Sequence, residues 1–242
     1  MRGEGQIIGC GTKNGKISIA VIAKNEEKNM EKVLFDINAV LGRGDLPLYE
    51  VFVVDGYSDD DTAGLAERCG VKTVRQDGGK GDAIRKALEV ATGEYVLFID
   101  ADNSSNPEEI PLLASKIREG RPDMVIVSRV LGSSEELGAS SFDNFIRLIG
   151  GRISTSIINW RWNAGLTDVQ NGFRIIRRDT ALALNLEDSG FAIEQEMVMK
   201  CLKMGKLITE IPGIERKRLH GRSKICKSHE VWRYAWSLAR NI

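Results

Sequence analysis

The fold is indicated most clearly by Tyr95-Val-Leu-Phe-Ile-Asp-Ala-Asp102, a short apolar run that ends in two carboxylates. Such a run, bounded by polar residues and rich in β-branched and aromatic side chains, is typical of a buried β-strand. The preceding segment, Gly81 to Ala91, has apolar residues at helical spacing. The stretch therefore predicts a helix that leads into a strand, with an acidic pair at the carboxyl end of that strand.

The same alternation of strand and helix extends over the first half of the chain. We predict strands at 17–23, 50–54, 71–74, 95–99 and 124–127, and helices at 26–41, 62–69, 81–91 and from Pro107 onward. This order predicts an α/β fold, in which helices flank both faces of a mostly parallel sheet. Ligands of such sheets bind beyond the carboxyl ends of the strands. Three of the predicted strands end there in polar residues, at Lys24-Asn25-Glu26, Asp55 and Asp100.

The second half of the chain has a different pattern. After Arg129 a long helix is predicted at 142–162, followed by a mixed segment and a final helix from Ser228. Residues 1–16 are polar and rich in glycine, which indicates a loose arm before the fold. We therefore predict one domain over 17–242, with an α/β half (17–130), a mixed half (131–227) and a C-terminal amphipathic helix (228–242).

Charge is balanced over the whole chain but not along it. The 242 residues are 42% hydrophobic and 28% charged, as in globular proteins, with 34 basic and 34 acidic side chains. Residues 214–227 contain six basic side chains and one acid, whereas residues 55–61 contain four carboxylates. Separate acidic and basic sites favour a cation and a small anion as ligands over a nucleic acid.

The cysteines and the hydropathy of the chain bear on its location. Four widely spaced cysteines without a CxxC pair favour reduced thiols in a cytosolic compartment. No apolar run approaches the ~20 residues that span a bilayer, and the N-terminus lacks the apolar stretch of a signal peptide. We therefore expect a cytoplasmic protein whose membrane contact is peripheral.

The acidic pair, Asp100 and Asp102, is a candidate site for a divalent cation. Alternate residues of an extended chain point the same way, so the two carboxylates can converge. Mg²⁺ and Mn²⁺ prefer oxygen ligands and complete their shell with phosphate and water. A cation on a diphosphate would stabilise the nucleoside diphosphate that leaves when a nucleotide sugar is cleaved. A solvated turn that caps the next helix is the alternative.

Two other loops can contribute to a nucleotide site. Asp55 ends a buried strand and can accept hydrogen bonds from a base or ribose, whereas we assign Asp59 to Asp61 to capping of the next helix. Gly78-Gly-Lys-Gly81 can bring backbone amides and an ammonium group near a diphosphate, although it lacks the spacing of a P-loop.

Taken in order, these motifs resemble the family-2 glycosyltransferases of GT-A (Rossmann-like) fold, especially the dolichyl-phosphate mannosyltransferase branch. The matching motifs are Asn25-Glu-Glu27, Val54-Asp-Gly-Tyr-Ser-Asp-Asp-Asp-Thr62, Lys80-Gly81, Asp100-Ala-Asp102, Ser128-Arg129, Asp168-Val-Gln-Asn-Gly-Phe-Arg174, Gly190-Phe-Ala-Ile-Glu-Gln-Glu196 and Arg218-Leu-His-Gly-Arg-Ser-Lys224. The chain departs from the family pattern at Ile22-Ala-Lys24, at Gly56 after Asp55, and at Ser104. These departures fall on base and metal contacts, so they bear on the identity of the nucleotide.

The resemblance implies an inverting, metal-dependent hexosyltransferase. Its donor would be a nucleotide sugar, GDP-mannose or UDP-glucose, and its acceptor a polyprenyl or dolichyl phosphate at the cytoplasmic face of a membrane. The implied donor contacts are Ala23, Asn25, Glu26, Asp55, Lys80, Asp100 and Ala101, with Mg²⁺ or Mn²⁺ on Asp100 and Asp102. The implied acceptor-phosphate contacts are Arg129, Arg147, Arg218, Ser223 and Lys224. The implied catalytic residues are Asp102, Arg129, Asp168 and Arg218.

Physical chemistry supports the acceptor assignment independently. The planar fork of arginine suits phosphate, and a basic cluster without interleaved aromatic residues suits a compact anion better than stacked bases. A solvated basic surface loop is the alternative.

The acceptor also decides whether a general base is needed. A phosphate monoester, with a second pKa of ~6, is already a dianionic nucleophile at neutral pH, whereas a sugar hydroxyl needs a base. Asp168 could be that base, but we favour a role in fixing the turn before Gly172. Glu194 and Glu196 are expected to brace the basic cluster or cap a helix.

Two helical segments could meet lipid. Both the segment 142–162 and the C-terminal helix combine apolar residues at helical spacing with Trp and Arg, a pattern of membrane surfaces. Core packing and a dimer contact are the alternatives, and the oligomeric state stays open.

For the function, the alternatives are transfer to a sugar hydroxyl, a nucleotidyltransferase and a non-catalytic nucleotide-sugar-binding module.

Overall fold

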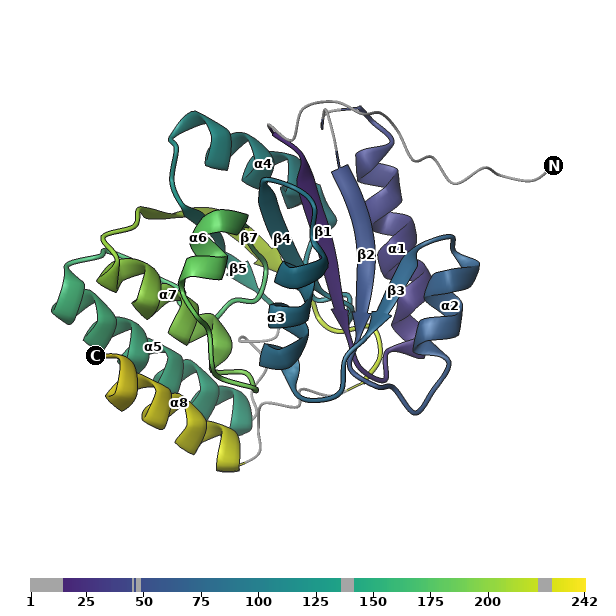
Figure 1. Cartoon of the computed structure of the whole chain (residues 1–242). Helices are drawn as coiled ribbons and strands as arrows, with labels where there is room; N and C mark the ends of the chain where they lie inside the picture. Colours follow the sequence, from purple (N-terminus) through teal and green to yellow (C-terminus); the bar gives the residue numbers. More distant parts are fainter. Residues whose placement is uncertain (1–14, 45, 47–48, 136–141, 222–227) are drawn as a thin grey trace.

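The computed structural model describes residues 15–44, 46, 49–135, 142–221 and 228–242, with only the backbone of residues 142–148 and 228–231 (Figure 1). The strands are β1 (Ile17–Ala23), β2 (Tyr49–Asp55), β3 (Lys72–Arg75), β4 (Tyr95–Asp100), β5 (Met124–Ser134), β6 (Arg174–Arg177) and β7 (Ile208–Glu215). The helices are α1 (Glu27–Leu41), α2 (Thr62–Arg68), α3 (Lys80–Val90), α4 (Ile110–Glu119), α5 (Phe142–Trp162), α6 (Arg178–Ala183), α7 (Ile193–Lys203) and α8 (Ser228–Asn241). The arm predicted over residues 1–16 lies outside the described residues, apart from Gly15 and Lys16.

The described strands form one mixed sheet in the order β3-β2-β1-β4-β6-β5-β7. Strands β1 to β4 are parallel to their neighbours among themselves, and β5 is parallel to β7. Strand β6 lies between β4 and β5 and is antiparallel to both. Strands from both halves of the chain therefore share one sheet, which is mostly parallel as predicted.

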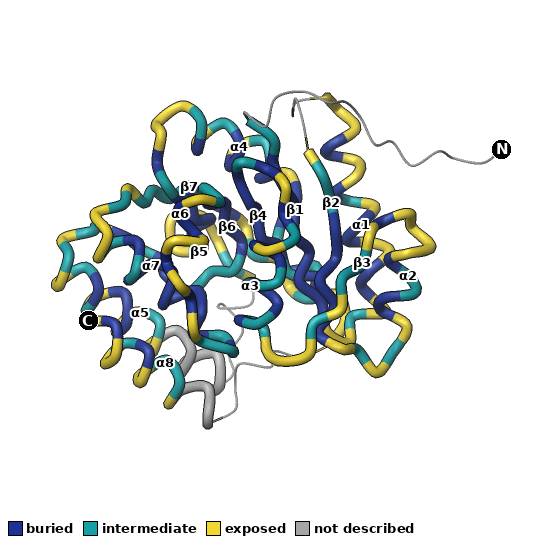
Figure 2. Tube along the Cα trace, in the orientation of Figure 1, coloured by how far each residue is buried: buried dark blue, intermediate teal, exposed yellow. Residues whose placement is uncertain are grey.

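The core lies on both faces of this sheet. Alternate residues of β1 enter opposite clusters: Ile19 and Val21 pack on the side of α1 and α4, and Ala20 and Ile22 on the side of α3 and α7. Figure 2 shows the strands as the buried centre of the molecule, enclosed by helices. Burial on both faces explains why these strands appear in the sequence as continuous apolar runs.

The predicted elements agree with the structure to within one residue at most boundaries. The bounds of β1 and α5 are those predicted, and β4 ends one residue later than predicted, at Asp100. Two differences matter. Pro107 opens a short 3₁₀ turn, Pro107–Glu109, before α4 begins. Strand β5 continues to Ser134 because, after a register shift, its last residues pair with β7.

The register places three polar strand ends at one edge of the sheet. Strand β1 lies between β2 and β4, with Ala23 opposite Asp55 and Ile22 opposite Asp100. Because parallel strands have their carboxyl ends at the same edge, the loops after β1, β2 and β4 lie next to one another. The fold therefore positions a ligand site at this edge.

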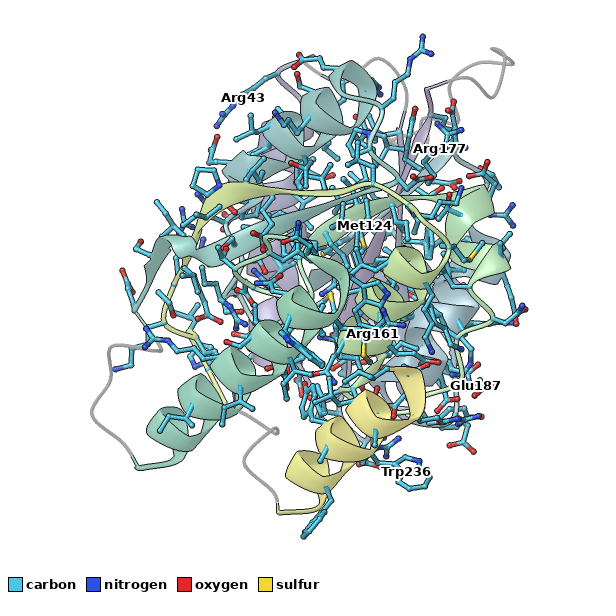
Figure 3. All side chains as sticks on the ribbon, turned by 90° about the vertical axis from the view of Figure 1, so that its left-hand side faces the viewer. Arg43, Met124, Arg161, Arg177, Glu187 and Trp236 are labelled. Atoms are coloured by element: carbon cyan, nitrogen blue, oxygen red, sulfur yellow. The ribbon has the colours of Figure 1, made fainter. Side chains whose placement is uncertain are left out.

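The second half of the chain adds a layer of helices beside the sheet. Helix α8 packs on α7, and both views in Figures 1 and 3 show α5 running alongside α8. Within the described residues, none of the helices combines the length and apolar character needed to cross a membrane.

Candidate active site at the carboxyl edge of the sheet

Asp55 and Asn25 are joined through Ser58 at the ends of β1 and β2. The Asp55 side chain is buried and accepts hydrogen bonds from the Ser58 amide, at 3.2 Å, and from the Ser58 hydroxyl. The backbone N–H of Asn25 donates to Ser58 Oγ at 2.8 Å. The Asn25 backbone is in the left-handed region, with a φ of 54°. Arg75 Nε lies 4.0 Å from Asp55. These contacts fix a carboxylate and a cation where the predicted donor base or ribose would bind.

The acidic run after Asp55 has structural partners. Asp60 accepts from the amides of Thr62 and Glu27 at 3.1 and 3.2 Å, so one carboxylate caps the starts of α2 and α1. Although partial burial opposes it, hydrogen bonds from Thr62 hold the pKa of Asp60 below its ordinary value. Asp61 pairs with Arg68. Capping is therefore confirmed for Asp60, whereas the prediction is wrong for Asp61, which stands at the N-cap of α2 and makes no side-chain capping hydrogen bond. Nearby, the amide of Glu26 donates to Thr62 Oγ1 at 2.8 Å, which ties the two loops together.

Lys80 bridges two carboxylates at the centre of the site. Its Nζ lies 2.8 Å from Asp100 Oδ2 and 2.7 Å from Glu194 Oε1, and 5.6 Å from the centroid of the Phe191 ring. Burial alone would lower the pKa of Lys80, but the charges of Asp100 and Glu194 outweigh it and raise that pKa. Lys80 is therefore a permanent cation beside the end of β4.

Glycines allow this close arrangement. A Cβ at Gly172 would lie 2.8 Å from Lys80 Nζ and 3.0 Å from Asp100 Oδ2. Cβ atoms at Gly79 and Gly81 would lie 1.9 Å from the carbonyl oxygens of Ser189 and Asp188. The Gly-Gly-Lys-Gly motif therefore serves close backbone packing around Lys80.

Asp102 is held on both of its oxygens. Its Oδ1 accepts from the Ser104 amide at 3.0 Å and from the Ser104 hydroxyl at 2.6 Å. Its Oδ2 lies 2.9 Å from Arg218 Nη2. The 216–221 segment thus returns to the end of β4, and the Asn29 side chain, in α1, donates to the His220 carbonyl at 3.3 Å.

Arg129 and Asp168 form a largely buried ion pair with two side-chain hydrogen bonds. Arg129 Nε donates to Asp168 Oδ2 at 2.6 Å and Nη2 to Oδ1 at 2.9 Å, and Nη1 reaches Glu215 at 3.2 Å. Burial would raise the pKa of Asp168, but the charge and hydrogen bonds of Arg129 lower it. Asp168 is therefore a fixed anion that orients Arg129, and its Oδ1 also accepts from the Gln170 amide at 3.4 Å, in the turn before Gly172.

A cavity brings these groups together. Its lining includes the cations Lys80, Arg129 and Arg218 and the carboxylates Asp100, Glu194 and Glu215, with the rings of Phe191 and Tyr234. The donor contacts predicted at Ala23, Asn25, Glu26 and Asp55 lie on the neighbouring strand ends, outside this lining, and Ala101 and Asp102 follow β4. Arg147 lies in α5, where its side chain is not described. Ser223 and Lys224 lie outside the described residues.

Several residues of the cavity had no role in the sequence-based prediction. Glu215 and Glu109 come from the end of β7 and the turn before α4. Glu109 accepts from the Ile214 amide at 2.7 Å, and burial raises the pKa of its carboxyl group. The basic run 214–227 indicated this region in the sequence but did not indicate its acidic partners.

Glu196 was predicted to brace the basic cluster or cap a helix. It accepts hydrogen bonds from the backbone amides of Glu187 and Asp188 instead.

The donor set at the end of β4 fits a divalent cation bound together with a phosphate ligand. Mg²⁺ is usually held by one or two carboxylates plus substrate phosphates, rather than by a full protein cage. Asp100 and Asp102 are two such carboxylates, and the Asp100 side chain is 30% exposed. The described residues contain no cluster of three or more His, Cys, Asp or Glu side chains suited to a metal.

The sequence profile of Glycosyl transferase family 2 matches residues 18–182, which include the loops of Asp55, Lys80, Asp100 and Arg129. The chain belongs to this family. The expected resemblance is thereby confirmed, and the matched range covers strands β2 to β6, nearly all of β1 and the Asp168 turn.

Three relatives of the chain come from archaea. The chain is 28% identical over 219 residues to the low-salt glycan biosynthesis hexosyltransferase Agl6 of Haloferax volcanii, which covers 90% of this chain and 52% of that protein. It is 34% identical over 164 residues to the glycosyltransferase AglJ of the same organism, and this match covers 67% of this chain and 52% of AglJ. It is 29% identical over 229 residues to a dolichol-phosphate mannosyltransferase of Pyrococcus furiosus, and this match covers 90% of this chain and 61% of that protein. The chain thus spans about half to three fifths of the length of these relatives.

Solved structures confirm the fold class. Glucosyl-3-phosphoglycerate synthase from Mycobacterium tuberculosis superposes with a TM-score of 0.75 at 20% identity, covering 93% of this chain and 78% of that one. The predicted GT-A architecture, a mixed sheet flanked by helices, is therefore confirmed.

Proposed function

We propose that this chain is an inverting hexosyltransferase that moves mannose or glucose from a nucleotide sugar to a polyprenyl or dolichyl phosphate. The observation that carries this proposal is the cavity in which Asp100 and Lys80, from the predicted donor side, meet Arg129 and Arg218, from the predicted acceptor side. Among the relatives, one is named as a dolichol-phosphate mannosyltransferase and another as a hexosyltransferase of glycan biosynthesis.

The donor would lie across the ends of β1, β2 and β4. Asp55, with Asn25 and Glu26 beside it, would contact the base and ribose, and Ala23 and Ala101 would line the path to the diphosphate. Lys80 would approach the diphosphate as an ammonium group. Asp100 and Asp102 would hold Mg²⁺ or Mn²⁺, which stabilises the charge of the leaving nucleoside diphosphate. Two of the mycobacterial structures of this fold contain Mn²⁺ or Mg²⁺ together with UDP, which supports a metal-dependent reaction.

The acceptor phosphate would bind at Arg129 and Arg218. Both guanidinium groups are held by carboxylates in this structure, Arg129 by Asp168 and Glu215, and Arg218 by Asp102. Arg147, Ser223 and Lys224 are proposed as further contacts. A dianionic phosphate oxygen would attack the anomeric carbon opposite the departing diphosphate, which inverts the configuration and needs no protein base. The lowered pKa of Asp168 supports this, because a weakly basic carboxylate is a poor proton acceptor.

A membrane surface is the proposed location of the acceptor. Trp232 and Trp236, in α8, are 77% and 70% exposed, and Trp160, in α5, is 82% exposed. Figure 3 shows Trp236 extending outward from α8. Exposed Trp beside Arg is suited to a lipid headgroup region. We place this contact at the cytoplasmic face, where free thiols such as those of Cys69 and Cys201 persist.

The test is a transfer assay with separated donors and acceptors. GDP-mannose and UDP-glucose, radiolabelled in the sugar, are each incubated with the protein, Mn²⁺ and either dolichyl phosphate in detergent or 3-phosphoglycerate. We expect label in the lipid phase with one donor, dependent on the metal. Transfer to phosphoglycerate alone would replace the lipid acceptor by a soluble one. Binding of a nucleotide sugar without transfer to either acceptor would favour a binding module.

A further inference from the structure

Helix α8 contacts a loop that packs against the lysine of the donor site. Arg233, in α8, pairs with Asp188 at 3.3 Å between Nη2 and Oδ1. Its guanidinium also covers Gly190, where a Cβ would lie 2.7 Å from Arg233 Cζ. Gly190 therefore leaves the space into which the Arg233 side chain fits.

The loop that receives Arg233 is itself firmly held. Asp188 Oδ1 accepts from the Gly190 amide at 2.6 Å, which closes the loop on the same carboxylate that binds Arg233. The Asp188 amide donates to Glu196, in α7, at 2.8 Å. The Asp188 carbonyl accepts from Arg85, in α3, at 2.8 Å. Asp188 thus joins α3, α7 and α8 at one point.

The other side of the loop packs on the backbone that carries Lys80. The Gly81 amide donates to the Ser189 carbonyl at 3.0 Å, and neither Gly79 nor Gly81 has room for a Cβ against this loop. Phe191, two residues after Ser189, places its ring 5.6 Å from Lys80 Nζ. A displacement of the loop would therefore move the start of α3, and Lys80 with it.

A second contact runs from α8 to the cavity. The Tyr234 carbonyl accepts from the buried Gln195 side chain at 3.1 Å, and Gln195 in turn accepts from Gln170 at 3.2 Å. Gln170 and Tyr234 both line the cavity. The position of α8 is therefore linked to the site at two consecutive residues, Arg233 and Tyr234.

We propose that Arg233 is a positioning residue for the donor site: by clamping the 188–191 segment it holds Lys80 between Asp100 and Glu194. Arg233 itself contacts Asp188 and Gly190 and acts on the donor only through Lys80. The inference rests on the proposed function, because it takes Lys80 to be a diphosphate contact.

The matched control is Arg240, on the same helix. Arg240 pairs with Glu187, and both side chains are about half exposed, so this pair contributes little to either stability or the position of the loop. Figure 3 shows Glu187 near the C-terminal end of α8. Arg240→Ala therefore removes the same charge from the same helix without releasing the segment that packs on Lys80.

The experiment measures binding of GDP and of UDP, each with Mn²⁺, by calorimetry, beside thermal unfolding. We expect Arg233→Ala to raise the dissociation constant of the bound nucleotide about tenfold. Arg233→Lys should restore most of the affinity, because an ammonium group can still pair with Asp188. Arg240→Ala should bind as the unmodified protein does. Equal affinity in Arg233→Ala and Arg240→Ala would overturn the inference.

A double variant separates positioning from general destabilisation. If Arg233 acts through Lys80, adding Arg233→Ala to Lys80→Ala should weaken nucleotide binding no further. Additive losses in the double variant would show that Arg233 acts on the fold as a whole and would overturn the proposal. If the unmodified chain binds neither GDP nor UDP, the assignment of the donor site is wrong. This result comes from the unmodified chain, so it is distinct from the failure of the Arg233 proposal, which is seen only in the variants.

Discussion

Arg218 and Asp102 form an ion pair with 2.9 Å between Nη2 and Oδ2, although one was predicted to bind the acceptor and the other the metal. Both side chains are largely buried, at 17% and 9% exposure. In this structure each group neutralises the other. In the proposed function, a divalent cation would take the place of Arg218 beside Asp102, and the acceptor phosphate would take the place of Asp102 beside Arg218.

Asp102→Asn is expected to lower kcat about a hundredfold or more, because it removes one charge from the proposed cation site. The fold should persist, since an amide oxygen can still accept from the Ser104 amide and hydroxyl. The measurement is turnover against Mn²⁺ concentration, beside a melting curve. Asp179→Asn, at a 73% exposed carboxylate, is the control. Unchanged turnover with unchanged metal dependence would contradict the metal assignment.

Asp168→Asn tests the ion pair with Arg129. The variant should lose roughly 3 kcal/mol of unfolding free energy, because it leaves a largely buried guanidinium with fewer anionic partners. It should also weaken acceptor use, since the Asn side chain has one acceptor oxygen and Arg129 loses one of its two paired hydrogen bonds. Urea unfolding and acceptor KM measure the two effects. A loss of activity by several orders of magnitude with an unaltered unfolding curve would instead identify Asp168 as a base and favour a hydroxyl acceptor.

The same pair predicts how stability depends on pH. The pKa of Asp168 is lowered in the folded state, so the folded protein holds this carboxylate ionised where the unfolded chain, with a pKa of about 3.9, begins to bind a proton. Its contribution is fully present above pH ~5 and is lost as the pH falls through the lower, folded value. Comparing the acid unfolding of the unmodified protein with that of Asp168→Asn isolates this contribution. The difference in unfolding free energy between the two should shrink toward low pH.

The sequence predicted the parallel part of the fold because local pattern and tertiary position agree there. Strands β1 and β4 are buried on both faces, so their apolar runs have one reasonable interpretation. Strand β6 is different. Arg174–Arg177 is four residues long, and its antiparallel position between β4 and β5 depends on partners distant in the sequence.

The site was predictable where a motif is contiguous and not where it depends on pairing. Asp55, Lys80 and Asp100 follow strand ends and glycines that are visible in the sequence. Glu194 as the partner of Lys80, and Glu215 as a partner of Arg129, are contacts between remote segments. Only the three-dimensional arrangement shows that the basic groups of this site are matched by carboxylates.

Gly172→Ala is expected to weaken donor binding about tenfold. The added Cβ would come within 2.8 Å of Lys80 Nζ and 3.0 Å of Asp100 Oδ2, so the pair must separate. Gly150→Ala, in α5, has open space for a Cβ and is the control. The comparison is the dissociation constant of GDP or UDP with Mn²⁺. If Gly172→Ala binds both nucleotides as tightly as the control does, then the Lys80–Asp100 pair is not part of the donor site.

Arg218→Ala should raise the acceptor KM, because it removes a charged donor from the proposed phosphate site. A hydrogen bond to a charged group contributes ~1.5–3 kcal/mol, so acceptor-limited kcat/KM should fall about ten- to a hundredfold. Arg218→Lys should restore only part of this, since an ammonium group cannot make the paired contact of a guanidinium. The affinity for the nucleotide sugar should change less, and it should rise rather than fall. Without the Arg218 guanidinium, the Asp102 carboxylate is freer to bind a metal. Donor and acceptor are therefore titrated separately, with lipid phosphate in detergent. If Arg218→Ala weakens nucleotide-sugar binding and leaves acceptor KM unchanged, Arg218 binds the diphosphate, and the lipid phosphate must bind elsewhere.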